Sequence, residues 1–291
     1  MPSTHVVTTW GEGVVLYRRL HSRLYHRAGT RCNLEGIIRM FGEHLPKTPM
    51  PLREITQETV ETYIQSMLAR GSSPANVNRH VRQIKSIFTW LIRRKMVADN
   101  PCSWIRPLKV LRTRKPMPSD SEILKLLFYL AKQEDLFYSD LVRLAMNTGL
   151  RLGELIYLHT GDIDLQARML HVRNRPENPL KDNEERSIPL NSVAMQIVSR
   201  WKRWALERKW LWWEEKAPAG TDSMSKNLKR RSRKAGVPHI TWYSLRHYFG
   251  TNAARVMPER ALMAVMGHGS SAVTNYYVHR ELLKIPTPPA I

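Results

Sequence analysis

The stretch TWYSLRHYFGTNAARVMPERALMAVMGHGSSAVTNYYVHR, residues 241–280, combines helical signals with a dense set of polar groups. We predict helices at Tyr243–Ala254 and Pro258–Gly267, because proline suits a first turn and glycine suits a helix end. Ser270 or Ser271 can cap a short helix after them. This half of the chain is therefore expected to be mainly helical.

The same stretch carries groups that suit chemistry on a phosphodiester. Arg246 supplies a guanidinium, His268 an imidazole and Tyr277 a phenol, while Arg151 and Lys181 upstream add two more cations. A guanidinium matches phosphate oxygens bidentately, and such a set can act without a metal ion. We therefore predict neither a metal site nor a cofactor.

Each of these residues also has an ordinary structural interpretation. Arg151 can form a structural ion pair with Glu154, three residues further on. Lys181 lies at the polar tip of a predicted hairpin, where a solvated lysine is common. His268 follows a glycine and can simply cap a helix end. The residues become informative only as an ordered set.

The composition is strongly basic. The chain of 291 residues has 46 Lys and Arg against 25 Asp and Glu, a formal charge of +21 and a pI near 10.4. This excess favours nucleic acid as partner, with a solvated basic surface as the alternative, and a hydrophobic content of 42% excludes a disordered tail. Cys32 and Cys102 lack CxxC spacing and suggest neither a disulfide framework nor a zinc site.

The chain shows no targeting signal. It does not open with a charged segment followed by an apolar run, and it has no uncharged apolar run of about 18 residues. We therefore expect no signal peptide, no membrane partner and a cytoplasmic, nucleoid-associated location.

Composition and periodicity divide the chain into two regions. Residues 1–105 are predicted to form an all-helical domain, and residues 106–118, rich in proline and cations, a basic interdomain linker. Residues 119–291 then form a second domain. The helices expected in the first domain are Gly13–Arg27, Leu34–His44, one capped by Thr56 and one capped by Ser73.

The second domain mixes helices with short strands. Apolar runs at Ile163–Leu165, Met169–Val172 and Arg186–Leu190 predict a small antiparallel sheet, with Lys181 at a hairpin tip. The predicted fold class is therefore mainly α with a small antiparallel β-sheet, in two domains. The helices expected around the strands are Ser119–Lys132, Ser139–Asn147, Arg151–Leu158, Ser192–Glu215 and Ser223–Lys234.

Several basic residues are candidates for DNA contact. The helix capped by Ser73 has an apolar stripe and, away from it, cations that suit a DNA major groove; a solvated basic side is the alternative. The linker and the helix at 223–234 offer further cations for phosphate contact, again with a solvated face as the alternative. The stripe is Val77, Val81, Ile84, Phe88 and Leu91. The candidates for DNA contact are Arg79, Arg82, Lys85, Arg93, Arg112, Arg114, Lys226, Lys229 and Arg230.

Taken in order, four strings of this sequence resemble the tyrosine recombinase (phage integrase) family. They are TGLRLGEL around Arg151, KDNEERSIPL from Lys181, YSLRHYFGT around Arg246, and MGHGSSAVTNYYVH with His268 and Tyr277. The family has an Arg box, a Lys on a β-hairpin, a His-x-x-Arg box, a Leu-Gly-His, and a nucleophilic Tyr nine residues after that His. The run SPANVNRHVRQIKSIFTWLIRRKMVADNP, residues 73–101, is similar to the last helix of the family's core-binding domain.

The resemblance implies a core-binding domain at 1–105 and a catalytic domain at 119–291. It assigns the nucleophile to Tyr277, a phosphate clamp to Arg151 and Arg246, the general acid to Lys181, and a phosphate hydrogen bond to His268. Tyr276 is excluded as the nucleophile by register alone. The implied partner is double-stranded DNA with specific recombination sites, on which the family acts as a tetramer.

One position departs from the family pattern, because Tyr243 stands where the second box usually has His. A phenol can donate a hydrogen bond to a phosphate oxygen, but it cannot readily act as a base at neutral pH because its pKa is ~10. Tyr243 is therefore predicted to help bind the phosphate, with weakened or lost activity as the alternative. His247, beside Arg246, is a candidate for compensation.

The resemblance implies a site-specific DNA recombinase, an integrase or resolvase of a mobile element or chromosome, that works through a 3′-phosphotyrosyl intermediate and a Holliday junction. Two alternatives remain at this point. One is a catalytically impaired homologue that only binds DNA, and the other is a nicking-closing enzyme like the type IB topoisomerases.

Overall fold

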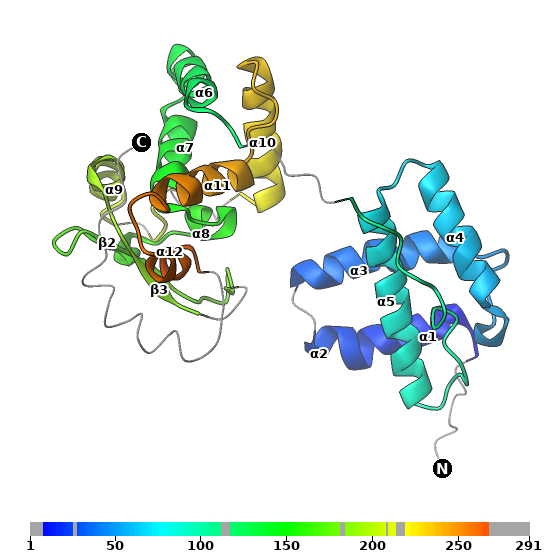
Figure 1. Cartoon of the computed structure of the whole chain (residues 1–291). Helices are drawn as coiled ribbons and strands as arrows, with labels where there is room; N and C mark the ends of the chain where they lie inside the picture. The colour runs from blue at the N-terminus through cyan, green and yellow to red at the C-terminus, as the bar shows by residue number, and fades with distance from the viewer. Residues whose placement is uncertain are drawn as a thin grey trace. The chain divides into compact units, whose positions relative to one another are not determined.

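The computed structural model describes residues 8–25, 28–111, 117–180, 184–207, 209–213 and 219–267. The chain forms two compact units, Met1–Thr113 and Arg114–Ile291 (Figure 1). The predicted core-binding domain at 1–105, basic linker at 106–118 and catalytic domain at 119–291 stay predictions. None of the helices among the described residues is long and apolar enough to cross a membrane.

The first unit is built from helices. The helix that was predicted to begin at Leu34 begins at Ala28 in the structure. The prediction missed its first turns because they are largely exposed and carry no apolar stripe. The predicted helix from Gly13 contains a π-helical turn and is described only to Tyr25. The elements of this unit are α1 (Trp10–Tyr17), the π-helical turn (Arg18–Ser22), α2 (Arg23–Tyr25), α3 (Ala28–His44), a 3-10 turn (Leu52–Glu54), α4 (Gln57–Ala69) and α5 (Pro74–Arg93).

Helix α5 is the centre of the first unit. Ser73 caps it by accepting a hydrogen bond from the Asn76 backbone N–H at 3.3 Å, and Pro74 occupies its first position. The helix packs against α1, α3 and α4. The predicted cap and the predicted apolar stripe are both confirmed, since every member of the stripe is buried in the core of this unit.

The second unit combines a three-stranded antiparallel sheet with helices. The strand order is β1-β2-β3, and Leu170 lies opposite both Ile163 and Ile188. The predicted small antiparallel sheet is confirmed. The elements are α6 (Asp120–Lys132), α7 (Leu136–Thr148), α8 (Leu152–Ile156), a 3-10 turn (Thr160–Asp162), β1 (Ile163–Asp164), β2 (Met169–Val172), β3 (Arg186–Pro189), α9 (Ser192–Trp204), α10 (Thr221–Lys234), α11 (Trp242–Ala253) and α12 (Glu259–Met266).

The tryptophan-rich run after Ser192 corrects one prediction. The helix expected at Ser192–Glu215 ends at Trp204. The chain then turns back, and the indole N–H groups of Trp212 and Trp213 donate to backbone carbonyls of α8 at 2.9 and 3.0 Å. The backbone of Leu211 pairs with Leu158 at 2.8 Å. These contacts with a distant segment outweigh the local helical pattern.

The packing of α7 against α11 forms the middle of the second unit (Figure 1). Helix α7 ends at Gly149, whose φ of +64° lies in the left-handed region that side chains with a Cβ rarely adopt. A Cβ at Gly149 would lie only 2.4 Å from Cδ1 of Phe249 on α11. The turn that leads to Arg151 therefore requires glycine for two separate reasons.

Replacing Gly149 by alanine is expected to lower the free energy of unfolding of the second unit by about 2–5 kcal/mol. The left-handed backbone costs roughly 1–2 kcal/mol for a residue with a Cβ, and overpacking adds roughly 1–3 kcal/mol. Gly236→Ala is the matched control, since Gly236 has a φ of +76° but no heavy atom within 4 Å of its Cβ position. Urea unfolding measures both variants, and equal losses would contradict the clash with Phe249.

Candidate active site

Arg151 occupies the N-cap position of α8, two residues after the Gly149 turn. Its backbone N–H donates to Oε2 of Glu154 at 2.8 Å, and its Nη1 donates to Oε1 of the same carboxylate at 3.0 Å. The Arg151 side chain is 31% exposed, whereas that of Glu154 is 4% exposed. The guanidinium is therefore held from its buried side and keeps a solvent-facing side.

Glu154 is the buried anion of the site. Besides Arg151 it receives Arg186 from β3, with Nη1 to Oε1 at 3.0 Å and Nη2 to Oε2 at 2.6 Å. Burial alone would raise the pKa of Glu154, but the hydrogen bonds and charge of Arg186, followed by those of Arg151, lower it below its ordinary value. One ionised carboxylate thus orients two guanidiniums.

Arg246 lies on α11 and is only 7% exposed. Its Nη1 donates to the carbonyl of Gly149 at 2.6 Å, and its Nη2 donates to the carbonyl of Met266. Burial, and then the charge of Arg151, lowers the pKa of Arg246 to about 10, which still leaves the guanidinium charged at neutral pH. Two backbone carbonyls therefore fix a buried cation whose desolvation would otherwise be unfavourable.

The C-terminal end of α12 collects three arginines. Helix carbonyls at this end have no partner within the helix and form the negative end of its dipole, so they favour cations. Gly267, with a φ of +60°, ends the helix, and a Cβ there would lie 2.9 Å from Nη1 of Arg186. The bonds run from Arg186 Nε to Val265 O at 2.8 Å, from Arg246 Nη2 to Met266 O, and from Arg151 Nη2 to Gly267 O at 2.5 Å.

Tyr243 and His247 lie one turn apart on α11, with ring centroids 4.5 Å apart in an edge-to-face arrangement. Tyr243 is 57% exposed. Both side chains line a cavity of about 400 Å³ together with Arg246, Leu262 and Met266. The phenol, the imidazole and the buried guanidinium therefore line one cavity. His247 lies beside Tyr243, the residue that departs from the family pattern.

Three predicted members of the site, Lys181, His268 and Tyr277, lie outside the described residues. The residues directly before Lys181 and His268 are described: Leu180 is buried in the core of the second unit, and the carbonyl of Gly267 accepts a hydrogen bond from Arg151. The roles assigned to the six predicted catalytic residues, and to Glu154 and His247 as supporting residues, stay predictions.

The predicted DNA contacts fall in both units and in the predicted linker. On α5, Arg79, Arg82, Lys85 and Arg93 are exposed, and on α10 the exposed cations include Lys226, Lys229 and Arg230. Arg231, next on α10, instead binds Asp135 through Nε at 2.7 Å and lies over the ring of Tyr138. Arg112 and Arg114 lie outside the described residues. DNA contact by these residues stays a prediction.

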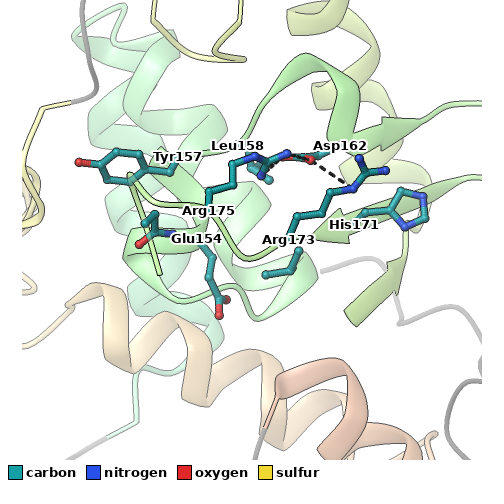
Figure 2. A pocket seen from close by; sticks show the side chains of 9 residues that line it. Glu154, Tyr157, Leu158, Asp162, His171, Arg173 and Arg175 are labelled. Atoms are coloured by element: carbon teal, nitrogen blue, oxygen red, sulfur yellow. Dashed lines mark hydrogen bonds and ion pairs between the residues drawn. The ribbon is translucent and has the colours of Figure 1, made fainter. Parts of the chain in front are cut away.

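Sequence reasoning missed a polar network beside Glu154, around a cavity of about 10 Å³ (Figure 2). Buried Asp162 accepts Arg175 Nη1 at 3.0 Å and forms a longer ion pair, 3.9 Å, with Arg173. Asn174 Oδ1 accepts the backbone N–H of Leu180 at 2.9 Å. These contacts hold the chain between β2 and the residue before Lys181. The available signal was two arginines, Arg173 and Arg175, directly after the predicted strand Met169–Val172, with Asp162 directly before the predicted strand at Ile163.

The profile of the phage integrase family matches residues 119–282 of this chain. The tyrosine recombinase XerC of Chlamydia pneumoniae is 26% identical over 246 residues, covering 78% of this chain and 75% of the relative. XerC of Actinobacillus pleuropneumoniae serotype 7 is 27% identical over 245 residues, covering 79% and 76%.

Two solved structures show the same fold. A lambda integrase dimer bound to a COC′ core site matches with a TM-score of 0.76 at 18% identity, covering 91% of this chain and 97% of that one. The Tn1549 transposon integrase in complex with a circular intermediate DNA matches with a TM-score of 0.72 at 20% identity, covering 93% and 95%. Since the family profile spans more than half of the residues, the chain belongs to the phage integrase family of tyrosine recombinases.

Proposed function

We propose that this protein is a site-specific DNA recombinase that cleaves and rejoins DNA strands through a 3′-phosphotyrosyl intermediate. One observation carries the proposal. Arg151 and Arg246, from α8 and α11, bind adjacent carbonyls at the end of α12, Gly267 and Met266. The next residue in the sequence is His268, the family's histidine, so both arginines are fixed at the backbone that leads to it.

In the proposed reaction the phenolic oxygen of Tyr277 forms a bond to the scissile phosphorus and its proton is released. The bond from phosphorus to the 5′ oxygen breaks, and Lys181 gives that oxygen a proton as general acid. Negative charge grows on the non-bridging oxygens, where Arg151 and Arg246 bind. A 5′-hydroxyl of a partner strand then reverses the step, so no ATP is consumed.

Support for DNA as the partner comes from charge and from relatives. The net charge of +21 suits a polyanion, and a lambda integrase tetramer bound to a Holliday junction matches this fold with a TM-score of 0.76 at 18% identity. We extend the proposal to specific recombination sites in double-stranded DNA, a tetrameric assembly on them, and action at the nucleoid in the cytoplasm. Integration of a mobile element is the reaction that the lambda and Tn1549 relatives suggest.

A covalent trapping experiment tests the proposal. Footprinting on DNA that flanks the gene first identifies a protected site, and a duplex with that site and a nick next to the scissile phosphate is then incubated with protein. The short cleaved fragment diffuses away, so a recombinase accumulates as a protein–DNA adduct that survives denaturing electrophoresis. A footprint without an adduct would favour a DNA-binding homologue, and relaxation of supercoiled plasmids without the site would favour a topoisomerase-like enzyme.

Replacing Tyr243 by histidine is expected to change the single-turnover cleavage rate by less than about tenfold. General acid–base catalysis contributes about 10²–10⁴-fold where it operates, and a phenol that only donates a hydrogen bond to the phosphate leaves that contribution to other residues. Tyr243→Phe, which removes the hydroxyl and keeps the ring against His247, is the matched control and is expected to slow cleavage. A gain of ~10²-fold or more in the histidine variant would show that this site has lost an acid–base group.

A further inference from the structure

We infer that Arg186 is a positioning residue for the phosphate site and that it acts on Arg151 through Glu154. The inference rests on the proposed role of Arg151 in binding the phosphate. Arg186 and Ile188 lie two residues apart on β3, so both point to the core face of the strand. The Arg186 side chain is only 6% exposed. A buried arginine is uncommon unless it is paired, and here the pairing leads directly to the site.

The guanidinium of Arg186 makes two connections at once. Its Nη1 and Nη2 hold both oxygens of Glu154, at 3.0 and 2.6 Å, and its Nε binds the carbonyl of Val265 at 2.8 Å. Because the guanidinium is planar and rigid, the three bonds together fix the carboxylate relative to the end of α12. A lysine ammonium carries the same charge but cannot reproduce this planar fork.

The same carboxylate holds Arg151. Glu154 accepts the Arg151 backbone N–H at 2.8 Å and its Nη1 at 3.0 Å, and Nη2 of Arg151 reaches Gly267. Arg186 and Arg151 are therefore fixed by the same two elements, the Glu154 side chain and the final turn of α12. Without the Arg186 fork, the carboxylate keeps its bonds from Arg151 but loses its connection to the carbonyl of Val265. Glu154 and the Arg151 guanidinium can then shift together. A misplacement of about 1 Å in a reacting site can lower the rate ~10²-fold.

A double-mutant cycle on the single-turnover cleavage rate separates positioning from general support of the fold. Arg151→Lys and Arg186→Lys are each expected to slow cleavage, by about 10²-fold for Arg186→Lys, while DNA affinity and melting temperature stay close to wild type. The double variant is expected to be about as slow as the slower single variant, because both changes remove the same placement of Arg151. Should Arg186→Lys fail to fold, Arg186→Gln takes its place in the cycle.

The control cycle pairs Arg151→Lys with Arg200→Met. Arg200 on α9 binds buried Asp140 of α7, so its loss tests the general effect of removing an ion pair from this unit. Its effect on the rate is expected to multiply with that of Arg151→Lys. Fold-changes that multiply in the Arg186 cycle as well, or a wild-type rate in Arg186→Lys, would overturn the inference. A wild-type rate in Arg151→Lys would instead contradict the proposed role of Arg151 in the reaction.

Discussion

A Tyr277→Phe variant is expected to form no covalent adduct on the nicked duplex while binding the same DNA with unchanged affinity. The change removes only the phenolic oxygen, the atom that would bond to phosphorus. Removing an enzyme nucleophile lowers turnover by about 10⁶-fold in a well-studied case, so the adduct should fall below detection. Denaturing electrophoresis of labelled DNA measures the adduct, and a gel-shift titration at fixed salt measures the affinity.

Tyr276→Phe is the matched control, because it makes the same chemical change one position earlier. Tyr277 is singled out only by its spacing of nine residues after His268 in the sequence, and both residues lie outside those that the structure describes. The Tyr276 variant is therefore expected to form the adduct. Loss of the adduct in Tyr276→Phe with retention in Tyr277→Phe would move the nucleophile by one residue, and retention in both would contradict a tyrosine nucleophile at this position.

The parts of the fold that follow from local chemistry could be predicted from the sequence. Ser73 followed by Pro74 predicts the start of α5, because the hydroxyl caps a backbone N–H and the proline ring suits the first turn. Gly267 predicts the end of α12 for a similarly local reason. Short apolar runs separated by Asn, Pro and charged turns predicted the sheet, since such runs are typical of strands.

Features that depend on distant contacts could not be predicted in the same way. The helical pattern after Trp204 is overridden because Trp212 and Trp213 donate to carbonyls of α8. Every residue has a backbone carbonyl, so the sequence does not indicate that three arginines would bind the carbonyls at the end of α12. For Arg186 the sequence did hold a signal, because this charged residue lies on the same strand face as the apolar Ile188. Its partner Glu154, however, lies 32 residues away in the sequence.

The arrangement around α12 also indicates why the family's histidine follows a glycine in this chain. Gly267 turns the backbone with a φ of +60°, and its carbonyl is free of the helix and available to Arg151. A side chain at this position would meet the guanidinium of Arg186, since a Cβ would lie 2.9 Å from Nη1. The backbone that leads to His268 and the placement of Arg151 are therefore fixed by the same turn.

Replacing Arg246 by lysine is expected to lower the single-turnover cleavage rate by about 10²–10³-fold, the usual loss when one fixed donor to a developing oxyanion is removed. The guanidinium is held by Gly149 O at 2.6 Å and by Met266 O, and these two bonds do not use all of its five N–H donors. The Arg246 side chain also lines the cavity together with Tyr243. A lysine ammonium cannot bind both carbonyls in this geometry and also contact two phosphate oxygens. Rapid-quench cleavage at saturating protein measures the rate.

Arg255→Lys is the control for Arg246→Lys, because Arg255 follows α11 and is exposed. Its cleavage rate is expected to match that of wild type. DNA affinity separates binding from chemistry. Because lysine keeps the positive charge, the dependence of DNA affinity on salt should stay close to that of wild type, whereas the cleavage rate at saturating protein should fall. A loss of less than tenfold in Arg246→Lys, in a variant with an unchanged melting temperature, would show that the buried arginine supports the fold and does not contact the reacting phosphate.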